Sequence, residues 1–125
     1  MKKVIQTENA PKAVGPYSQG IKVDKFLFVS GQVAMDPKES RIVANGIKEQ
    51  TVRVMENIKA ILHAAGYNVS DVVQSNVYLS SMALFSEFNN EYAKYFDKEF
   101  PTRATVGIEL MRGALVEISV VAYKE

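Results

Sequence analysis

The 125-residue sequence contains no cysteine and a single histidine, His63. Without cysteine, disulfide frameworks, thiolate metal sites and cysteine nucleophiles are excluded, which fits a reducing compartment. His63 has no second histidine with which to complete a metal site, or paired-histidine ribonuclease chemistry within one chain. We therefore expect no metal site, and we interpret His63 as a surface residue in the last turn of a helix, where positive charge suits the helix dipole.

The sequence also lacks an excess of charge and any long apolar run. Lys and Arg number 15 against 14 Asp and Glu, which argues against a nucleic acid or a membrane as partner, because both select a basic face. The apolar start of the chain ends at Gln6, too early for a signal peptide, and no stretch approaches transmembrane length. The G-x-S-x-G motif of serine hydrolases is also missing. We expect a soluble, cytoplasmic protein.

Hydrophobic periodicity predicts an α+β fold in one domain spanning residues 1–125. Apolar residues make up 47% of the chain and charged residues 23%, an ordinary globular composition. Asn45 is a candidate cap for the longer helix, and Gly66 stands at its C′ position. A turn at Gly113 joins the last two strands in this prediction. The expected strands cover 3–7, 18–23, 26–32, 72–79, 103–110 and 115–123, and the expected helices cover 45–65 and 83–96.

The two predicted helices suffice to cover only one face of a six-stranded, mostly antiparallel sheet. The strand at 26–32 is apolar on both sides, so we expect it to be central. The face without helices would carry Phe26 or Phe28, together with Val72 and Val121. Leaving this much apolar surface in water is unfavourable, so the pattern indicates an oligomer packed through the sheet.

Arg103 and Glu117 are the strongest candidates for a chemical site. Arg103 stands where a loop enters a strand, and its planar guanidinium suits a carboxylate. Glu117 is the one carboxylate inside a nearly all-apolar strand, a place that suits an acid or base. Three simpler interpretations stay open: Arg103 as a surface residue, Glu117 on a solvent-facing side, and the two joined in a cross-strand salt bridge.

Two glycine-containing segments are weaker candidates. Ser30, Gly31 and Gln32 end the central strand, so Gly31 is either an ordinary bend or a point where a ligand approaches the backbone N–H. Tyr17 lies in the segment 15–18, which is either a turn before a strand or a loop that offers a phenol.

Short segments distributed over nearly the whole chain carry a resemblance to a known family. They are Asn9-Ala10-Pro11, Gly15-Pro16-Tyr17-Ser18-Gln19-Gly20, Ser30-Gly31-Gln32, Gln50, Asn57-Ile58, Ala64-Ala65-Gly66, Phe100-Pro101-Thr102-Arg103 and Val116-Glu117-Ile118. As an ordered set they resemble the Rid family, the reactive intermediate deaminases also called YjgF proteins. The turn at 110–113 is shorter than the corresponding turn of that family.

The resemblance implies a chorismate-mutase-like fold and a homotrimer, with the sheets lining a central barrel and three sites between subunits. It also implies hydrolysis of 2-aminoacrylate, 2-iminopropanoate and 2-iminobutanoate to 2-keto acids and ammonia, without a cofactor. Arg103 matches the arginine that holds the substrate carboxylate, and Glu117 the glutamate that holds the attacking water. The matching positions that line the pocket are Tyr17, Ser30, Gly31, Asn89 and Thr105, the last through its backbone carbonyl.

Two other functions stay open at this point. Family members with an incomplete site have non-catalytic binding or regulatory roles, and ribonuclease or translation-inhibitor activity is ascribed to some relatives. The near-neutral charge and the lack of a basic run disfavour the ribonuclease.

Overall fold

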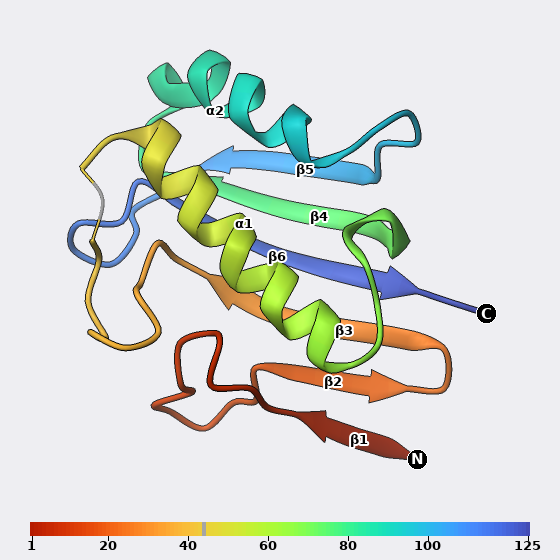
Figure 1. The fold of residues 1–125 in the computed structure, drawn as a ribbon. Helices are drawn as coiled ribbons and strands as arrows, with labels where there is room; N and C mark the ends of the chain where they lie inside the picture. The colour runs from red at the N-terminus through yellow and green to blue at the C-terminus, as the bar shows by residue number, and fades with distance from the viewer. Residues whose placement is uncertain (44) are drawn as a thin grey trace.

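A computed structural model describes residues 1–43 and 45–125. It contains a six-stranded sheet with the strand order β1-β2-β3-β6-β4-β5. Only β4 and β5 pair in parallel, and the other neighbours are antiparallel. The predicted α+β class, element order and mostly antiparallel sheet are confirmed (Figure 1). The strands are β1 (Lys2–Ile5), β2 (Gly20–Val23), β3 (Phe26–Gln32), β4 (Val72–Leu79), β5 (Thr102–Gly107) and β6 (Val116–Tyr123).

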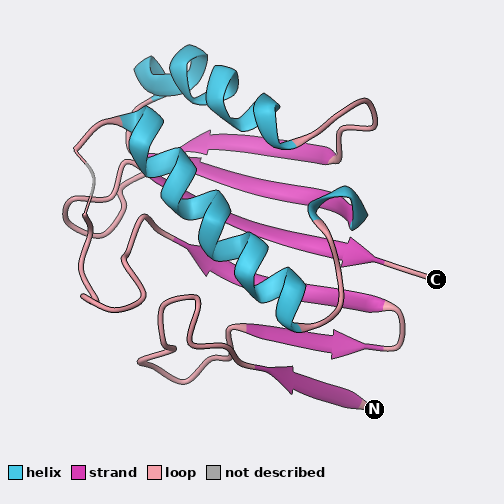
Figure 2. Ribbon diagram, in the orientation of Figure 1, coloured by secondary structure: helices cyan, strands magenta, loops and turns pink. Residues whose placement is uncertain are grey.

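Two α-helices, α1 (Ile47–Ala64) and α2 (Phe85–Tyr92), lie on the same face of the sheet (Figure 2). α1 begins after Gly46 rather than at Asn45, and Gly66 follows its end with a positive φ of 86°, as its C′ position predicts. In the described part of the chain, no helix combines the length and the apolar character needed to cross a membrane. The buried residues of α1 recur at helical spacing and include Ile47, Val54, Met55, Ile58, Ile61 and Leu62.

The second predicted helix, residues 83–96, is divided into three pieces. A 3₁₀ turn, η2 (Met82–Leu84), precedes α2, and another, η3 (Ala93–Tyr95), follows it. The side chain of Ser81 accepts a hydrogen bond from the backbone N–H of Ala83, which fixes the tighter first turn. A short 3₁₀ turn, η1 (Val69–Asp71), also leads into β4.

The prediction that the last two strands form a hairpin is wrong. β6 lies between β3 and β4, whereas β5 lies outside β4 at the sheet edge. Their burial explains the order: β6 alternates between buried and half-buried residues along its whole length, whereas β5 is mostly exposed. A strand with a fully apolar face belongs in the centre of a sheet, and the more polar strand is tolerated at the edge.

The face of the sheet without helices, called the open face below, is apolar around β2 and β3. Phe26 and Phe28 point to it with 41% and 47% of their surfaces exposed, and half-buried Val121 pairs with Phe28. Val72 was expected here but is only 5% exposed and belongs to the core under the helices. The register shift between Val72 and Gln74 is the reason, because a bulge of this kind reverses the side to which the preceding residue points.

Candidate functional site

Arg103 lies on β5 opposite Ser75 of β4, on the helix-covered side of the sheet. Its guanidinium carbon is 5.2 Å from the ring centroid of Tyr92, 5.6 Å from that of Phe85 and 5.8 Å from that of Phe88. All three rings belong to α2, which packs along the β5 edge of the sheet (Figure 1). The rings attract the guanidinium through their negative faces, and we call Arg103 with these rings the arginine cluster.

The positive charge of the arginine cluster has no carboxylate beside it. Within the residues that the structure describes, the ion pairs are Arg41–Glu39, Lys59–Glu56 and Lys94–Glu91, so none involves Arg103. Aromatic rings hold a guanidinium in place without neutralising it. The planar fork of Arg103 therefore remains available to an anion, and a carboxylate matches its geometry best.

Two buried polar atoms accompany the arginine cluster. Thr105 follows Arg103 by two residues on β5 and so shares its side of the strand, while Asn89 stands one turn after Phe85 on α2. The Asn89 Oδ1 and Thr105 Oγ1 atoms are buried and have no hydrogen-bond partner. Native structures rarely leave such atoms unpaired, so Asn89 Oδ1 is suited to accept a hydrogen bond from a bound molecule or a neighbouring chain, and the Thr105 hydroxyl to accept or donate one.

Glu117 lies on β6 with its side chain on the open face, half-buried. Its carboxylate leans over Gly31 of β3 so closely that a Cβ on Gly31 would overlap Oε2 and lie 3.0 Å from Cδ. The space above Gly31 is therefore taken by the Glu117 side chain. Burial raises the pKa of Glu117 above its ordinary value. A carboxylate in such a position is a candidate acid or base.

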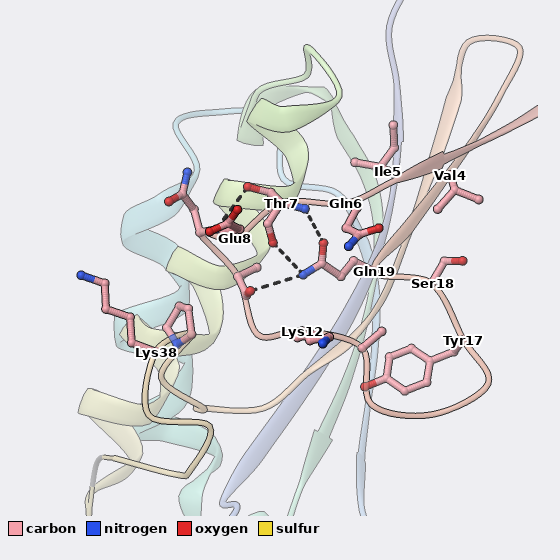
Figure 3. Close-up of a pocket in the computed structure, with 14 residues that line it drawn as sticks. Val4, Ile5, Gln6, Thr7, Glu8, Lys12, Tyr17, Ser18, Gln19 and Lys38 are labelled. Atoms are coloured by element: carbon pink, nitrogen blue, oxygen red, sulfur yellow. Dashed lines mark hydrogen bonds between the residues drawn. The ribbon is translucent and has the colours of Figure 1, made fainter.

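Ser30 directly precedes Gly31 on β3, and Tyr17 lies in the loop that leads into β2. The Ser30 hydroxyl donates a 2.6 Å hydrogen bond to the Ser18 carbonyl, so it is engaged within the chain. The register of β3 shifts between Val29 and Gln32, which places Ser30 and Gly31 outside the regular ladder. Tyr17 is 51% exposed and lines an open cavity of about 890 Å³ under the N-terminal loop (Figure 3). We call Ser30, Gly31 and Glu117 the glutamate cluster.

The two clusters lie on opposite sides of the sheet within one chain. Arg103 faces α2, Glu117 faces the open side, and β4 separates their strands. The cross-strand salt bridge between them is therefore wrong, whereas the alternative that placed Glu117 on the solvent-facing side of its strand is confirmed for the single chain, where the side chain is half-buried. One chain brings Arg103, Asn89 and Thr105 together, and separately brings Glu117, Gly31 and Ser30 together.

His63 is exposed in the last turn of α1, as predicted. Among residues 1–43 and 45–125, no group of three or more His, Asp or Glu side chains is arranged to hold a metal ion.

Comparisons of the sequence and of the structure with known proteins both lead to one family. The family model described as Endoribonuclease L-PSP matches residues 7–124. A RutC family protein of Saccharolobus solfataricus is 54% identical over 125 residues, covering 99% of each chain. The 2-iminobutanoate/2-iminopropanoate deaminase of Bos taurus is 40% identical and covers 98% of this chain and 90% of its own. A crystal structure of a Thermotoga maritima protein superposes with a TM-score of 0.96 at 44% identity, covering 100% of this chain and 99% of that one.

The chain belongs to the Endoribonuclease L-PSP family, which is the Rid or YjgF family. The names of its relatives denote different activities, since some are called endoribonucleases, others deaminases, and one a regulator. Membership of the Rid family therefore establishes the fold, but it does not select one of these activities. The choice among activities depends on the chemistry of the two clusters.

Two glutamines from the segments that resemble the Rid family hold the loops around the glutamate cluster. Gln19 is buried, donates hydrogen bonds to the carbonyls of Thr7, Ala10 and Pro11, and accepts one from the N–H of Thr7 (Figure 3). It thereby fastens the N-terminal loop to the start of β2, beside Tyr17.

Gln50 of α1 holds the loop before Glu117 in place through hydrogen bonds of its side chain. Its side chain donates to the Gly113 carbonyl at 2.8 Å and accepts from the Leu115 N–H at 2.8 Å. This short loop departs from the Rid pattern in sequence, yet two hydrogen bonds fix it two residues before Glu117.

The resemblance to the Rid family offers Phe85 or Phe88 as an apolar wall of the pocket, but it does not indicate that these rings and Tyr92 support Arg103. Phe85, Phe88 and Tyr92 had the spacing of a helix face that packs on a core, and Phe88 and Tyr92 are indeed buried. Nothing in that spacing indicates that an arginine of a neighbouring strand ends above the three rings of the helix.

Proposed function

We propose that this protein hydrolyses short-chain 2-imino and enamine acids to 2-keto acids and ammonia, at sites that two copies of the chain build together. Candidate substrates are 2-aminoacrylate, 2-iminopropanoate and 2-iminobutanoate, and no cofactor takes part. The observation that carries the proposal is an uncompensated guanidinium and a half-buried carboxylate on opposite faces of one sheet. The 40% identity to a deaminase over almost the whole chain supports the same reaction class.

In this proposal Arg103 binds the substrate carboxylate with its planar fork. The Thr105 backbone carbonyl meets the imine nitrogen, and Asn89 lines the same side. From the other copy, Tyr17, Ser30 and Gly31 line the opposite wall, and Glu117 holds the attacking water.

The reaction itself makes modest demands on the protein. Protonation of an enamine at carbon gives an iminium ion, which is a strong electrophile. Water adds to it with loss of a proton to Glu117, and the resulting carbinolamine collapses to the 2-keto acid and ammonia. A carboxylate whose pKa is raised by burial is better matched to take a proton near neutral pH than an ordinary one. Positioning and charge placement supply the remaining acceleration.

The second copy is required because one chain holds the two clusters apart. The open face offers an apolar surface for self-association around Phe26 and Phe28. A homotrimer packed through these sheets would cover that surface, and each interface would bring Arg103 of one copy toward Glu117 of its neighbour. Sedimentation of the purified protein at micromolar concentration should therefore show no stable monomer.

The activity is tested by measuring 2-keto acid formation in an assay coupled to a threonine dehydratase. The parent protein should speed the release of 2-oxobutanoate and ammonia beyond the spontaneous rate. A release rate equal to the spontaneous one would overturn the proposed reaction.

The shared site is tested by complementation. Chains carrying Arg103→Ala and chains carrying Glu117→Gln are co-expressed with different tags and purified through both. In every mixed trimer purified through both tags, one interface of the three joins a neighbour that keeps Arg103 to a neighbour that keeps Glu117 in the required order, so activity should recover to about a third of the parent value. Chains with Arg103→Ala mixed with the Arg103→Ala/Glu117→Gln double variant should recover none. No recovery in the first mixture would place the site within one chain.

A further inference from the structure

We propose that Tyr92, anchored by Ser75, is a positioning residue that orients the Arg103 guanidinium for a carboxylate ligand. This inference rests on the proposed function, because it concerns the arginine that would hold the substrate. It adds two residues to those already proposed for the site: Ser75 in the core of β4 and Tyr92 on α2.

The contacts form a continuous link from the core to Arg103. Ser75 is fully buried on β4 and is the direct neighbour of Arg103 across the parallel β4–β5 pair. Tyr92 is 3% exposed and donates a 2.9 Å hydrogen bond to the Ser75 hydroxyl oxygen. The Tyr92 ring is also the nearest of the three rings to the Arg103 guanidinium, at 5.2 Å. The rigid position of Ser75 thus fixes a ring on which the guanidinium rests.

The other two rings have no comparable anchor. Phe85 and Phe88 contribute only apolar contacts, so their orientation depends on packing alone. The ring of Tyr92 contacts the Arg103 guanidinium, and its hydroxyl is hydrogen-bonded to Ser75 in the core. Burial raises the pKa of Tyr92, more strongly than the Ser75 hydrogen bond and the Arg103 charge lower it, so the phenol keeps its proton and continues to donate.

Orientation matters because Arg103 is exposed on an edge strand and has no ion pair among the described residues to fix it. A long arginine side chain loses rotamer freedom when it binds a ligand, and this loss weakens binding. A guanidinium already held flat against a fixed ring loses less. The carboxylate is gripped equally in the ground state and the transition state, so weaker positioning should raise KM and leave kcat nearly unchanged.

Tyr95 provides a matched control on the adjoining 3₁₀ turn η3. Its hydroxyl also makes a side-chain hydrogen bond, to Glu56 Oε2 of α1 at 3.3 Å, and its pKa is raised to about 12. Unlike Tyr92, its ring is not among those around Arg103. Tyr95→Phe therefore removes a tyrosine hydroxyl from the same region without touching the arginine cluster.

The experiment compares Tyr92→Phe, Tyr92→Leu and Tyr95→Phe with the parent. It measures KM and kcat for 2-iminobutanoate, the Kd of 2-oxobutanoate by calorimetry, and nitrogen relaxation at the Arg103 Nε–H. Tyr92→Leu should raise KM and Kd about tenfold with kcat within about twofold of the parent, the range expected for a lost cation–π contact. Tyr92→Phe keeps the ring and should raise both about threefold, while Tyr95→Phe should leave all three quantities unchanged.

The relaxation measurement separates this inference from the proposed reaction. If the parent shows no deamination, greater Arg103 Nε–H mobility in Tyr92→Phe than in Tyr95→Phe still supports the positioning role. Equal Arg103 mobility in Tyr92→Phe and the parent, with equal Kd, would overturn it. A fall in melting temperature alone, shared by Tyr92→Phe and Tyr95→Phe, would show that Tyr92 serves only the packing of α2. Because Tyr92→Phe preserves the buried ring, the test stands even if Tyr92→Leu fails to fold.

Discussion

The arginine cluster and the glutamate cluster place opposite charges in contrasting surroundings. Arg103 is exposed, makes no ion pair with the described residues and is supported by three rings of a helix packed at the sheet edge. Glu117 is half-buried, lies against bare backbone at Gly31 and has a raised pKa. The first arrangement favours binding of an anion, and the second favours exchange of a proton. A ligand that needs both must reach both faces of the sheet, which a single chain does not permit.

Removing the guanidinium should have the largest effect. Arg103→Ala loses a charge-assisted fork to a carboxylate, which costs about 3 kcal/mol or about a hundredfold in kcat/KM. Arg103→Lys should also be poor, because an ammonium does not reproduce bidentate geometry. Folding should be little affected, since Arg103 is exposed and makes no ion pair with the described residues.

Steady-state kinetics and a melting curve on both arginine variants check this expectation. The decisive comparison is between activity and stability in the same preparation. Activity of Arg103→Ala within twofold of the parent would remove this residue from the mechanism, and an equal loss in both activity and stability would make it structural.

The sequence predicted the elements well because their signals are local. The apolar spacing of α1 and Gly66 at its C′ position fixed the long helix to within a few residues. The pattern did not reveal where β5 and β6 lie in the sheet, because strand order depends on which strand fills the centre. The bulge at Val72–Gln74 was equally invisible, since one inserted residue leaves hydrophobic alternation almost unchanged while it moves Val72 into the core.

The candidate site was predicted as a set of residues between subunits, but the face of the sheet on which each residue lies was not. Arg103 and Glu117 were recognised by their residue types and by resemblance, and neither signal says to which face a side chain points. Their placement on opposite faces follows from the long-range strand register, which aligns Arg103 with buried Ser75 and Glu117 with Tyr78 on the other side of β4. The aromatic support of Arg103 also depends on tertiary packing, because α2 and β5 meet only in the folded chain.

Changing the carboxylate to an amide should give an effect of similar size, confined to kcat. Glu117→Gln retains the shape and the hydrogen bond to a water but cannot take its proton, so kcat should fall on the order of a hundredfold with KM little changed. In the parent, kcat should fall as the pH decreases through the folded-state pKa of Glu117, which lies above the ordinary value of 4.5. This acidic limb should be absent from the pH profile of Glu117→Gln.

The thermal stability of Glu117→Gln provides a second, independent test of the role of Glu117. Because the folded-state pKa of Glu117 is raised, its contribution to stability is complete below the unfolded-state pKa and is lost as the pH rises through the folded-state value. At neutral pH the folded protein therefore carries an unfavourable buried charge, and Glu117→Gln should melt at the same temperature or higher. A lower melting temperature with an unchanged kcat would show that Glu117 stabilises the fold instead.

Adding one methyl group at Gly31 should give the smallest of these effects, and it acts on the glutamate cluster alone. An alanine Cβ there would overlap Glu117 Oε2, and the strand backbone beneath leaves the carboxylate as the group that moves. A displaced base loses alignment with its water, so Gly31→Ala should lower kcat about tenfold while KM changes less. Gly15→Ala is the control, because its Cβ would meet the Tyr17 ring at 3.4 Å, an ordinary contact. If the two alanine variants have equal kcat values, the close approach of Glu117 to Gly31 has no part in catalysis.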